Sequence, residues 1–387
     1  MALHFIKIPL PNLKEGEGSC LRVIEDLEQE GLHRPMLFVE SFLRDIEVSK
    51  PLETLLQEKG YEVTLFTGIK PNPSATLVEE AKQVYLEHHC DCLIALGGGS
   101  TIDLAKAVGV LVAYPNKHIG HFEGVLKIHR RIPVLFAMPT TAGTGSETTL
   151  ATVIVDEEKK HKYQVDAPAI VPKYAYLDGS LLAKLNPKII ASTGMDALTH
   201  ALEAYIGNSN TKFTKQCAID AFLGFKKNFI AFYDDVNNIE ARNGMLRMSY
   251  DAGNAFTRAY VGYVHALAHA LGGYYHVPHG LANAILLPYV IRAFGSPLNQ
   301  KAAEICKLLD VEIGDKEPFE ALASYIDETN KRVGIPKQFE LPIDEQAYDF
   351  LARHAEKEGN PLYPVPVLKT KQELEAILKQ ANKGVSS

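Results

Sequence analysis

The sequence predicts a parallel α/β domain followed by an all-helical domain. Three observations support this fold class. Short apolar runs alternate with amphipathic stretches in the first half, strand signals stop after about Asn186, and 387 residues are enough for two or three domains. We therefore expect an α/β domain at residues 1–186 and a helical domain at residues 187–387.

The elements of the first half follow from the period of its apolar residues. Buried strands are expected at residues 35–39, 61–66, 92–96 and 132–138. Helices are expected between them at residues 48–59, 74–86 and 101–114. Ser74 follows the turn Pro71-Asn72-Pro73 and is expected to cap the second of these helices. A β-hairpin with a charged turn at 156–160 is expected at residues 151–165.

The second half has the period of helices throughout. The helical stretches lie at residues 192–206, 212–228, 239–253, 260–271, 281–294 and 299–309. A last helix is expected after an ordered loop at residues 360–366. A cleft between two domains of this kind is the expected place for a ligand.

Composition excludes several classes of partner. The hydrophobic content of 46% allows a sizeable core, and the net charge of −7 offers no basic field for nucleic acid or an anionic membrane. Five cysteines without metal or disulfide spacing favour reduced thiols in a cytoplasmic protein. The first residues lack the pattern of a signal peptide, and the apolar runs are too short to span a bilayer.

Two glycine-rich turns follow predicted strands. Gly97-Gly98-Gly99-Ser100 precedes a helix, whose first N–H groups suit a phosphate, although Ile102 departs from the usual dinucleotide fingerprint. The next strand leads into Thr140-Thr141-Ala-Gly-Thr144-Gly-Ser, which suits phosphate and ribose hydrogen bonds. A plain strand-to-helix turn and a capped loop are the structural alternatives. Together the two turns predict a Rossmann-like, dinucleotide-binding sheet.

Glu40 stands at the end of the strand expected at residues 35–39. An acidic residue there can accept hydrogen bonds from an adenosine ribose and repel a 2′-phosphate, which favours NAD over NADP. The alternative is an ordinary solvated carboxylate.

Carboxylate and imidazole side chains gather in the helical half. Asp196 and His200 are four residues apart, as are His265 and His269, and such pairs share one face of a helix. His276 and His279 follow within a few residues. Taken singly, each histidine can be a satisfied core residue, but the set is a donor group for Fe(II) or Zn(II). Spacing alone leaves the fourth ligand open.

Four motifs in this order resemble the iron-containing (group III) alcohol dehydrogenase family, which has a dehydroquinate synthase-like architecture. They begin at Gly97 (GGGSTID), Pro139 (PTTAGTGSE), Gly194 (GMDALTHALE) and His265 (HALAH, followed by Pro278-His279-Gly280). The chain departs from the family at Ala151, and at residues 360–366 it lacks the Asn-Pro-Arg segment often found there. Both departures concern the shape of the pocket.

The resemblance implies a metal held by Asp196, His200, His265 and His279, with Fe(II) expected first and Zn(II) second. It implies that His269 is not a ligand but lies close to substrate and nicotinamide, as a proton relay or a structural residue. The implied contacts of NAD are Glu40, Asn72, Gly97, Gly98, Gly99, Ser100, Asp103, Thr140, Thr141, Thr144 and Lys162.

The expected activity is reversible hydride transfer between a small alcohol and NAD, with aldehyde or ketone as the other product. One alternative is an enzyme similar to glycerol dehydrogenase or dehydroquinate synthase. The latter needs basic residues around its substrate, and residues 188–290 contain few. The other alternative is a non-enzymatic nucleotide-binding protein. From the resemblance we also expect a homodimer or a larger homo-oligomer.

Overall fold

The computed structural model describes residues 7–157 and 161–384. It divides into two compact units. The α/β unit comprises the described residues up to Leu185 together with Val236–Leu246, and the helical unit comprises Asn186–Asp235 and the residues from Arg247 onward. The second segment of the α/β unit is held by Gly179, whose N–H donates to Asn243 Oδ1 at 2.9 Å. The assignment of cofactor binding to residues 1–186 and of metal binding to residues 187–387 stays a prediction.

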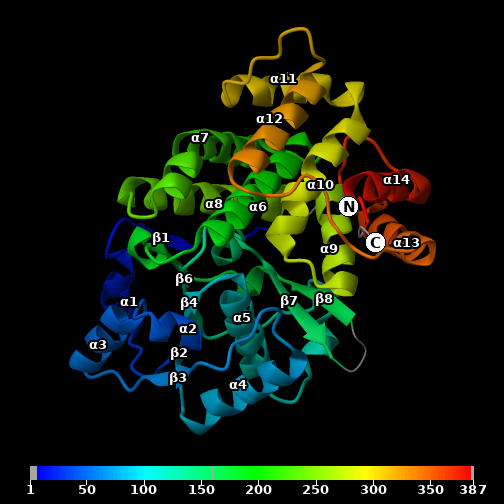
Figure 1. The fold of residues 1–387 in the computed structure, drawn as a ribbon. Helices are drawn as coiled ribbons and strands as arrows, with labels where there is room; N and C mark the ends of the chain where they lie inside the picture. The colour runs from blue at the N-terminus through cyan, green and yellow to red at the C-terminus, as the bar shows by residue number, and fades with distance from the viewer. Residues whose placement is uncertain (1–6, 158–160, 385–387) are drawn as a thin grey trace. The chain divides into compact units, whose positions relative to one another are not determined.

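A six-stranded parallel sheet forms the centre of the α/β unit. Its strand order is β1-β9-β6-β4-β2-β3, and β6, β4, β2 and β3 follow one another in this order in Figure 1. The strands are β1 (Asn12–Glu15), β2 (Pro35–Val39), β3 (Thr64–Phe66), β4 (Cys92–Gly97), β6 (Val134–Pro139) and β9 (Tyr174–Leu177). The four predicted strands are confirmed as β2, β3, β4 and β6, whereas β1 and β9 were not predicted.

The register of the sheet brings three turns to one edge. Val39 pairs with Leu96, and Gly97 pairs with Pro139, so β2, β4 and β6 end at the same level. Because the strands are parallel, the residues that follow them lie at the same edge of the sheet. The carboxyl edge therefore carries Glu40 and both glycine-rich turns.

One face of this sheet packs against helices through alternate strand residues. Met36, Phe38 and Leu93 belong to a buried cluster that includes residues of α4, α5 and the hairpin. The helices of the unit before the hairpin are α1 (Val23–Glu30), α2 (Ser41–Asp45), α3 (Lys50–Glu58), α4 (Ala75–Glu87) and α5 (Gly99–Ala113). Ser74 caps α4 as predicted, because its side chain accepts a hydrogen bond from Leu77 N–H at 3.2 Å.

The predicted hairpin is confirmed as an antiparallel pair, β7 (Ala151–Asp156) and β8 (His161–Asp166). With β5 (Gly124–Val125) it forms a second, three-stranded sheet. Residues 158–160 of the charged turn lie outside the described part of the chain.

The helical unit contains no strand longer than a bridge among its described residues. Its helices are α6 (Pro187–Ile206), α7 (Lys212–Asp234), α9 (Tyr263–Tyr275), α10 (His279–Phe294), α11 (Asn299–Leu308), α12 (Pro318–Arg332), α13 (Glu345–Gly359) and α14 (Lys371–Ala381). The helix α8 (Ile239–Ala259) begins in the α/β unit and ends in the helical unit. The predicted fold class is confirmed by these two kinds of unit.

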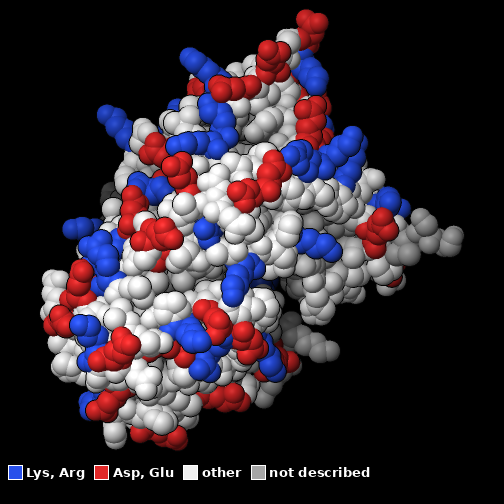
Figure 2. All heavy atoms as spheres, turned by 60° about the vertical axis from the view of Figure 1, so that its left-hand side comes forward, with Lys and Arg blue, Asp and Glu red and all other residues white. Residues whose placement is uncertain are grey.

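Acidic and basic side chains are mixed over the face of the molecule that Figure 2 presents. Among the described helices, none is by itself long and apolar enough to cross a membrane. Among them, only the pair His279–Phe294 and Ser296–Leu308 has, when taken together, the length and apolar composition of a membrane-spanning segment, and this pair is bent by 99°.

Candidate metal centre and cofactor site

The helix α6 supplies two side chains to a buried polar cluster. It begins at Asn186, whose side chain accepts a hydrogen bond from Ile189 N–H at 3.0 Å, and Pro187 follows at the first helical position. Asp196 and His200 lie one turn apart on this helix, so both point in the same direction. Both are buried, with 2% and 4% of their surface exposed.

A residue in the left-handed backbone conformation, between α9 and α10, brings two more histidines to this cluster. The helix α9 carries His265 and ends at Tyr275. The next residue, His276, has φ = 56° and turns the chain so that α10 can begin at His279. The start of α10 approaches α6 closely, because a Cβ on Gly280 would lie 2.5 Å from the carbonyl oxygen of Ser192. His276 is thus a turn residue next to the cluster.

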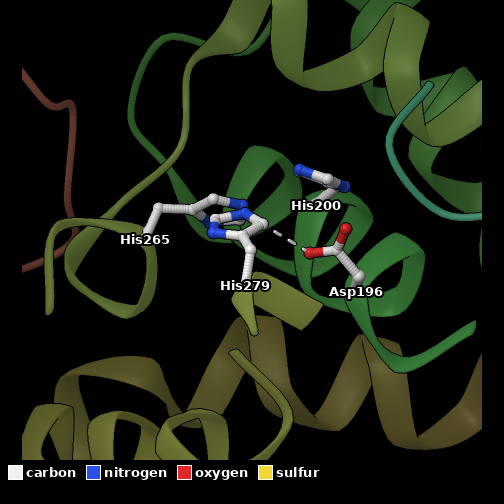
Figure 3. Close-up of side chains that lie close together, drawn as sticks. All are labelled: Asp196, His200, His265 and His279. Atoms are coloured by element: carbon white, nitrogen blue, oxygen red, sulfur yellow. Dashed lines mark ion pairs between the residues drawn. The ribbon is translucent and has the colours of Figure 1, made fainter. Parts of the chain in front are cut away.

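Four side chains converge in this cluster. Figure 3 shows Asp196, His200, His265 and His279 pointing toward one another, and one donor atom from each lies within 4.8 Å of the others. The dashed line marks His279 Nε2 and Asp196 Oδ1, which are 3.6 Å apart. The ring of Phe256 stacks on His200 at 4.2 Å between centroids. The helically paired His269 is not among the four.

One carboxylate oxygen and two ring nitrogens surround a single amide nitrogen at the centre of the cluster. Asn283 Nδ2 lies 2.7 Å from Asp196 Oδ1, 3.2 Å from His265 Nε2 and 3.1 Å from His279 Nε2. An amide nitrogen has two hydrogens, so it cannot donate to all three atoms when both ring nitrogens carry lone pairs. A divalent cation would satisfy them all, and imidazole nitrogen with carboxylate oxygen suits Fe(II) and Zn(II). The side chains present therefore fit a metal ion.

Two carboxylates hold the histidines of α9. Glu203 Oε2 lies 2.6 Å from His265 Nδ1, and Glu358 Oε1 lies 2.7 Å from His269 Nδ1. Burial, reinforced by the neighbouring imidazoles, lowers the pKa of His265 well below its usual value, so this ring is neutral near pH 7. Burial raises the pKa of Glu203 to about 7, against the N–H groups of Gly262 and Val264 that favour its charged form.

The environment of Glu358 shifts its pKa in the other direction. Burial acts to raise it, but the charge of His269 and hydrogen bonds from His269 and Tyr363 outweigh burial and lower the pKa. Glu358 is therefore a carboxylate that can orient His269. Glu203, Asn283, Phe256 and Glu358 had no assigned role in the sequence prediction, although Glu203 lies on the same face of α6 as Asp196 and His200.

At the carboxyl edge of the sheet, the first glycine-rich turn is closely packed. A Cβ on Gly97 would lie 2.3 Å from Thr101 Oγ1, and a Cβ on Gly99 would lie 2.8 Å from the Thr144 side chain. A larger residue at position 99 would therefore push the two turns apart, and one at position 97 would displace Thr101 at the start of α5. Gly98 stands at the N-cap of α5 without a side-chain cap, which leaves the first N–H groups of a 15-residue helix for an anion.

Polar contacts join further predicted cofactor residues. Thr101 Oγ1 donates to Glu40 Oε1 at 2.9 Å and fixes this carboxylate. Asn72 has φ = 55°, its N–H donates to Ser100 Oγ at 3.3 Å, and its Oδ1 accepts from Lys162 Nζ at 2.8 Å. The structure thus brings Asn72, Ser100 and Lys162 together from three separate segments.

Asp103 ties the second turn to α5. Its Oδ1 accepts a hydrogen bond from Ser146 Oγ at 2.6 Å, and its Oδ2 accepts one from Val153 N–H at 3.1 Å. Thr140 N–H donates to the carbonyl oxygen of Gly97 at 3.0 Å, which links the two turns directly. Both oxygens of Asp103 thus hold the turn in place, and a contact of Asp103 with NAD stays a prediction.

A fully buried lysine lies beneath the second turn. Lys106 Nζ donates to Thr149 Oγ1 at 2.7 Å and to the carbonyl oxygens of Ala151 and Thr149 at 2.8 and 3.0 Å. Burial lowers the pKa of Lys106 to about 8, while the charges of Asp103 and Glu147 oppose that shift. Lys106 was not among the predicted residues, because an isolated lysine in a helical stretch is typical of an exposed position.

Comparison with known proteins identifies the family. The model of the iron-containing alcohol dehydrogenase matches residues 11–179, and the model of the C-terminal domain of that family matches residues 190–382. The chain therefore belongs to the iron-containing alcohol dehydrogenase family of oxidoreductases, as the motifs predicted.

Individual relatives align with nearly the whole chain. Alcohol dehydrogenase 4 of Saccharomyces cerevisiae (strain YJM789) is 35% identical over 95% of this chain and 95% of its own length. The NAD-dependent methanol dehydrogenase of Bacillus methanolicus is 33% identical over 95% of this chain and 97% of its own. The crystal structure of a 1,3-propanediol oxidoreductase superposes with a TM-score of 0.92 at 32% identity, covering 97% of this chain and 99% of the other.

Proposed function

We propose that this protein is a metal-dependent oxidoreductase that interconverts a small alcohol and its aldehyde or ketone by hydride transfer to or from NAD(H). The observation that carries the proposal is the convergence of Asp196, His200, His265 and His279 within 4.8 Å in a protein of this family. A divalent metal held there, Fe(II) first and Zn(II) second, would supply a Lewis acid for the substrate oxygen, and NAD would accept the hydride.

The four side chains have separate parts in this proposal. The three imidazoles offer neutral nitrogen donors, and the carboxylate of Asp196 offsets part of the charge of the metal. The burial of Asp196, His200 and His265 limits competition by water for their ligand atoms and strengthens electrostatic effects at the substrate oxygen, while the half-buried His279 lies at the open side of the cluster. Phe256 covers one face of the His200 ring and limits its rotation.

His269 is proposed to exchange the hydroxyl proton of the substrate. Its ring stacks on that of His279, with 5.2 Å between centroids, and a quarter of its side chain is exposed. Glu358 holds Nδ1, so the other ring nitrogen remains for proton exchange with substrate and water. Glu358 thus acts as a positioning residue for His269.

The cofactor is proposed to bind at the carboxyl edge of the sheet. The N-terminus of α5 at Gly98 and Gly99 suits the pyrophosphate, and the hydroxyls of Thr140, Thr141 and Thr144 suit further phosphate and ribose contacts. Glu40 would accept the hydrogen bonds of the adenosine ribose and thereby favour NAD over NADP. The name of the Bacillus methanolicus relative, an NAD-dependent enzyme, supports this choice.

We also propose a homodimer or larger homo-oligomer in the cytoplasm. The five cysteines, all free and buried, support a reducing compartment. Size-exclusion chromatography with light scattering would determine the assembly.

The test of the proposed function is metal analysis of anaerobically purified protein, followed by a substrate panel with NAD(H) and NADP(H). The panel contains short primary alcohols, diols, hydroxy acids and the matching aldehydes. We expect about one divalent metal per chain and net formation of NADH with at least one alcohol. His279→Ala should lose the metal and nearly all activity, because it removes one of four ligands.

The matched control is His276→Asn, three residues away and outside the cluster. Asparagine tolerates the left-handed conformation of residue 276, so this variant should keep metal and activity. Full metal content in His279→Ala, or the absence of net NAD(H) or NADP(H) turnover across the panel, would contradict the proposal. Turnover without net NADH would instead favour chemistry similar to that of dehydroquinate synthase.

A further inference from the structure

The strongest unassigned feature is a buried carboxylate behind the metal cluster. Glu203 lies on α6, three residues after His200, with 3% of its surface exposed. Its two oxygens receive three N–H groups: Oε1 accepts from Val264 N–H at 2.7 Å, and Oε2 accepts from Gly262 N–H at 2.8 Å and faces His265 Nδ1 at 2.6 Å. All three donors belong to one short segment at the start of α9.

This arrangement determines which nitrogen of His265 carries the hydrogen. Gly262 and Val264 N–H donate to the two oxygens of Glu203 and so favour its carboxylate form, which offers only lone pairs; Nδ1 then carries the hydrogen of the 2.6 Å contact. The lone pair of a neutral ring then lies on Nε2, the atom that faces Asn283 and the rest of the cluster. A metal ligand needs that lone pair.

The same carboxylate also fixes where His265 stands. The N-cap of α9 is Gly262, which has no side chain to cap the helix, and Glu203 satisfies N–H groups of this first turn from the neighbouring helix. A Cβ on Gly262 would lie only 2.7 Å from Glu203 Oε1, so the close approach requires glycine at this position. The side chain of Glu203 therefore couples the orientation of the His265 ring to the position of the start of α9.

We propose that Glu203 is a positioning residue that sets the tautomer of His265 and thereby the affinity of the cluster for a divalent metal. This inference rests on the proposed function, because it assigns a role toward the metal of that site. Removing such a partner typically costs about 10–100-fold in metal affinity.

Glu203→Gln tests the role with little change in volume. The amide has one oxygen and one NH2 group, so it cannot accept all three N–H groups. If NH2 faces His265, it donates to Nδ1 and moves the ring hydrogen to Nε2, the proposed ligand atom. If NH2 faces Val264 N–H instead, two hydrogen-bond donors face each other at the start of α9, and Val264 N–H loses its acceptor. Either orientation disturbs the ligand.

The matched control is Glu358→Gln, which makes the same change at the neighbouring histidine. Glu358 holds His269 one turn further along α9, and His269 is outside the cluster. Metal affinity is measured by competition with a chromophoric chelator for Zn²⁺ and Co²⁺. We expect about 10–100-fold weaker binding for Glu203→Gln and wild-type affinity for Glu358→Gln. Equal affinities in wild type and Glu203→Gln, or equal losses in the two variants, would overturn the inference.

A double-mutant cycle separates positioning from general damage. In the His265→Ala background, Glu203→Gln should cause no further loss of Zn²⁺ affinity, because Glu203 acts through His265. A further loss of the same size in that background would overturn the inference. If Glu203→Gln proves unfolded by circular dichroism, Gly262→Ala replaces it, since the added methyl group pushes on Glu203 Oε1 while leaving the carboxylate in the chain.

A measurement on the metal-free protein distinguishes failure of this inference from failure of the proposed function. Histidine-selective ¹⁵N labelling reports the tautomer of His265, assigned with His265→Ala. We expect the hydrogen on Nδ1 in the wild type and a changed pattern in Glu203→Gln. A wild-type ring with its hydrogen on Nε2 overturns the inference whether or not the protein binds metal, whereas a wild type that binds no metal contradicts only the proposed function.

Discussion

The carboxylate of Glu40 stands at the end of β2 and is oriented by Thr101. In the proposed complex it accepts hydrogen bonds from the ribose of NAD and repels the 2′-phosphate of NADP. A side chain held in this way loses little entropy on binding. At the scale of single residues, Glu40 is therefore expected to decide the choice between NAD and NADP.

Glu40→Ala should therefore shift the preference toward NADP. We expect the ratio of kcat/KM for NADP to that for NAD to rise by about 10-fold or more, which corresponds to about 1.4 kcal/mol. Thr101→Val is the control: it keeps the charge, so NADP should remain disfavoured while KM for NAD rises moderately. An unchanged ratio in Glu40→Ala would show that this carboxylate does not face the ribose.

Single residues were predictable where a motif names them. The group formed by Asp196, His200, His265 and His279 is the one implied by the family resemblance, whereas helical spacing alone pairs His265 with His269. Asn283 follows His279 by four residues on α10, so spacing could have pointed to that one contact. Its contacts with Asp196 and His265, and the contact of Glu358 with His269, arise only because helices distant in sequence pack together. Sequence spacing reports neighbours on one helix, not neighbours across helices.

At the scale of elements, the helix α5 and the second glycine-rich turn depend on one buried cation. Lys106 donates to the carbonyl oxygens of Thr149 and Ala151, just after the turn that carries Thr140 and Thr144. Because backbone acceptors buried without a donor are unfavourable, Lys106 stabilises the course of the chain from the turn into β7.

Lys106→Met tests this contribution at nearly constant volume. We expect a loss of about 3–5 kcal/mol in the free energy of unfolding, since the carboxylates of Asp103 and Glu147 lose a buried counter-charge. Affinity for NAD, measured by fluorescence titration, should fall as well. Lys82→Met is the control. Lys82 is also buried, but its Nζ contacts Glu79 and Pro115, away from the turn, so affinity for NAD should not change. Equal effects on NAD binding would contradict the role of Lys106.

Most elements were predictable from the period of their apolar residues, and the exceptions have physical reasons. The strand β1 has the sequence Asn-Leu-Lys-Glu and lies at the edge of the sheet, so it shows neither a buried run nor alternation. The strand β9 is only four residues long. Both are defined by pairing with each other across the sequence, which no local pattern reports.

At the scale of the whole molecule, ligands should stabilise the two units separately. All four proposed metal ligands belong to the helical unit, and all proposed cofactor residues belong to the α/β unit. A ligand that binds only the folded state contributes about 4 kcal/mol at about 1,000 times its Kd. Metal and NAD are therefore expected to protect different parts of the chain.

Hydrogen exchange followed by mass spectrometry can measure this difference. Removing the metal with a chelator should increase exchange in α6, α9 and the start of α10, and should leave β2 and β4 unchanged. Adding NAD should slow exchange at the end of β4 and the start of α5. Increased exchange spread evenly over both units after chelation would contradict the assignment of the metal to the helical unit.

The segment Val236–Leu246 makes the α/β unit discontinuous along the chain. A fragment that stops at Leu185 contains every strand of the sheet but lacks this segment, including the Asn243 side chain that receives Gly179 N–H. During synthesis, the α/β unit can be complete only after the ribosome has also made α6 and α7, which belong to the other unit. No single cut therefore separates the two units, although the end of the strand signals near Asn186 suggests one place to make it.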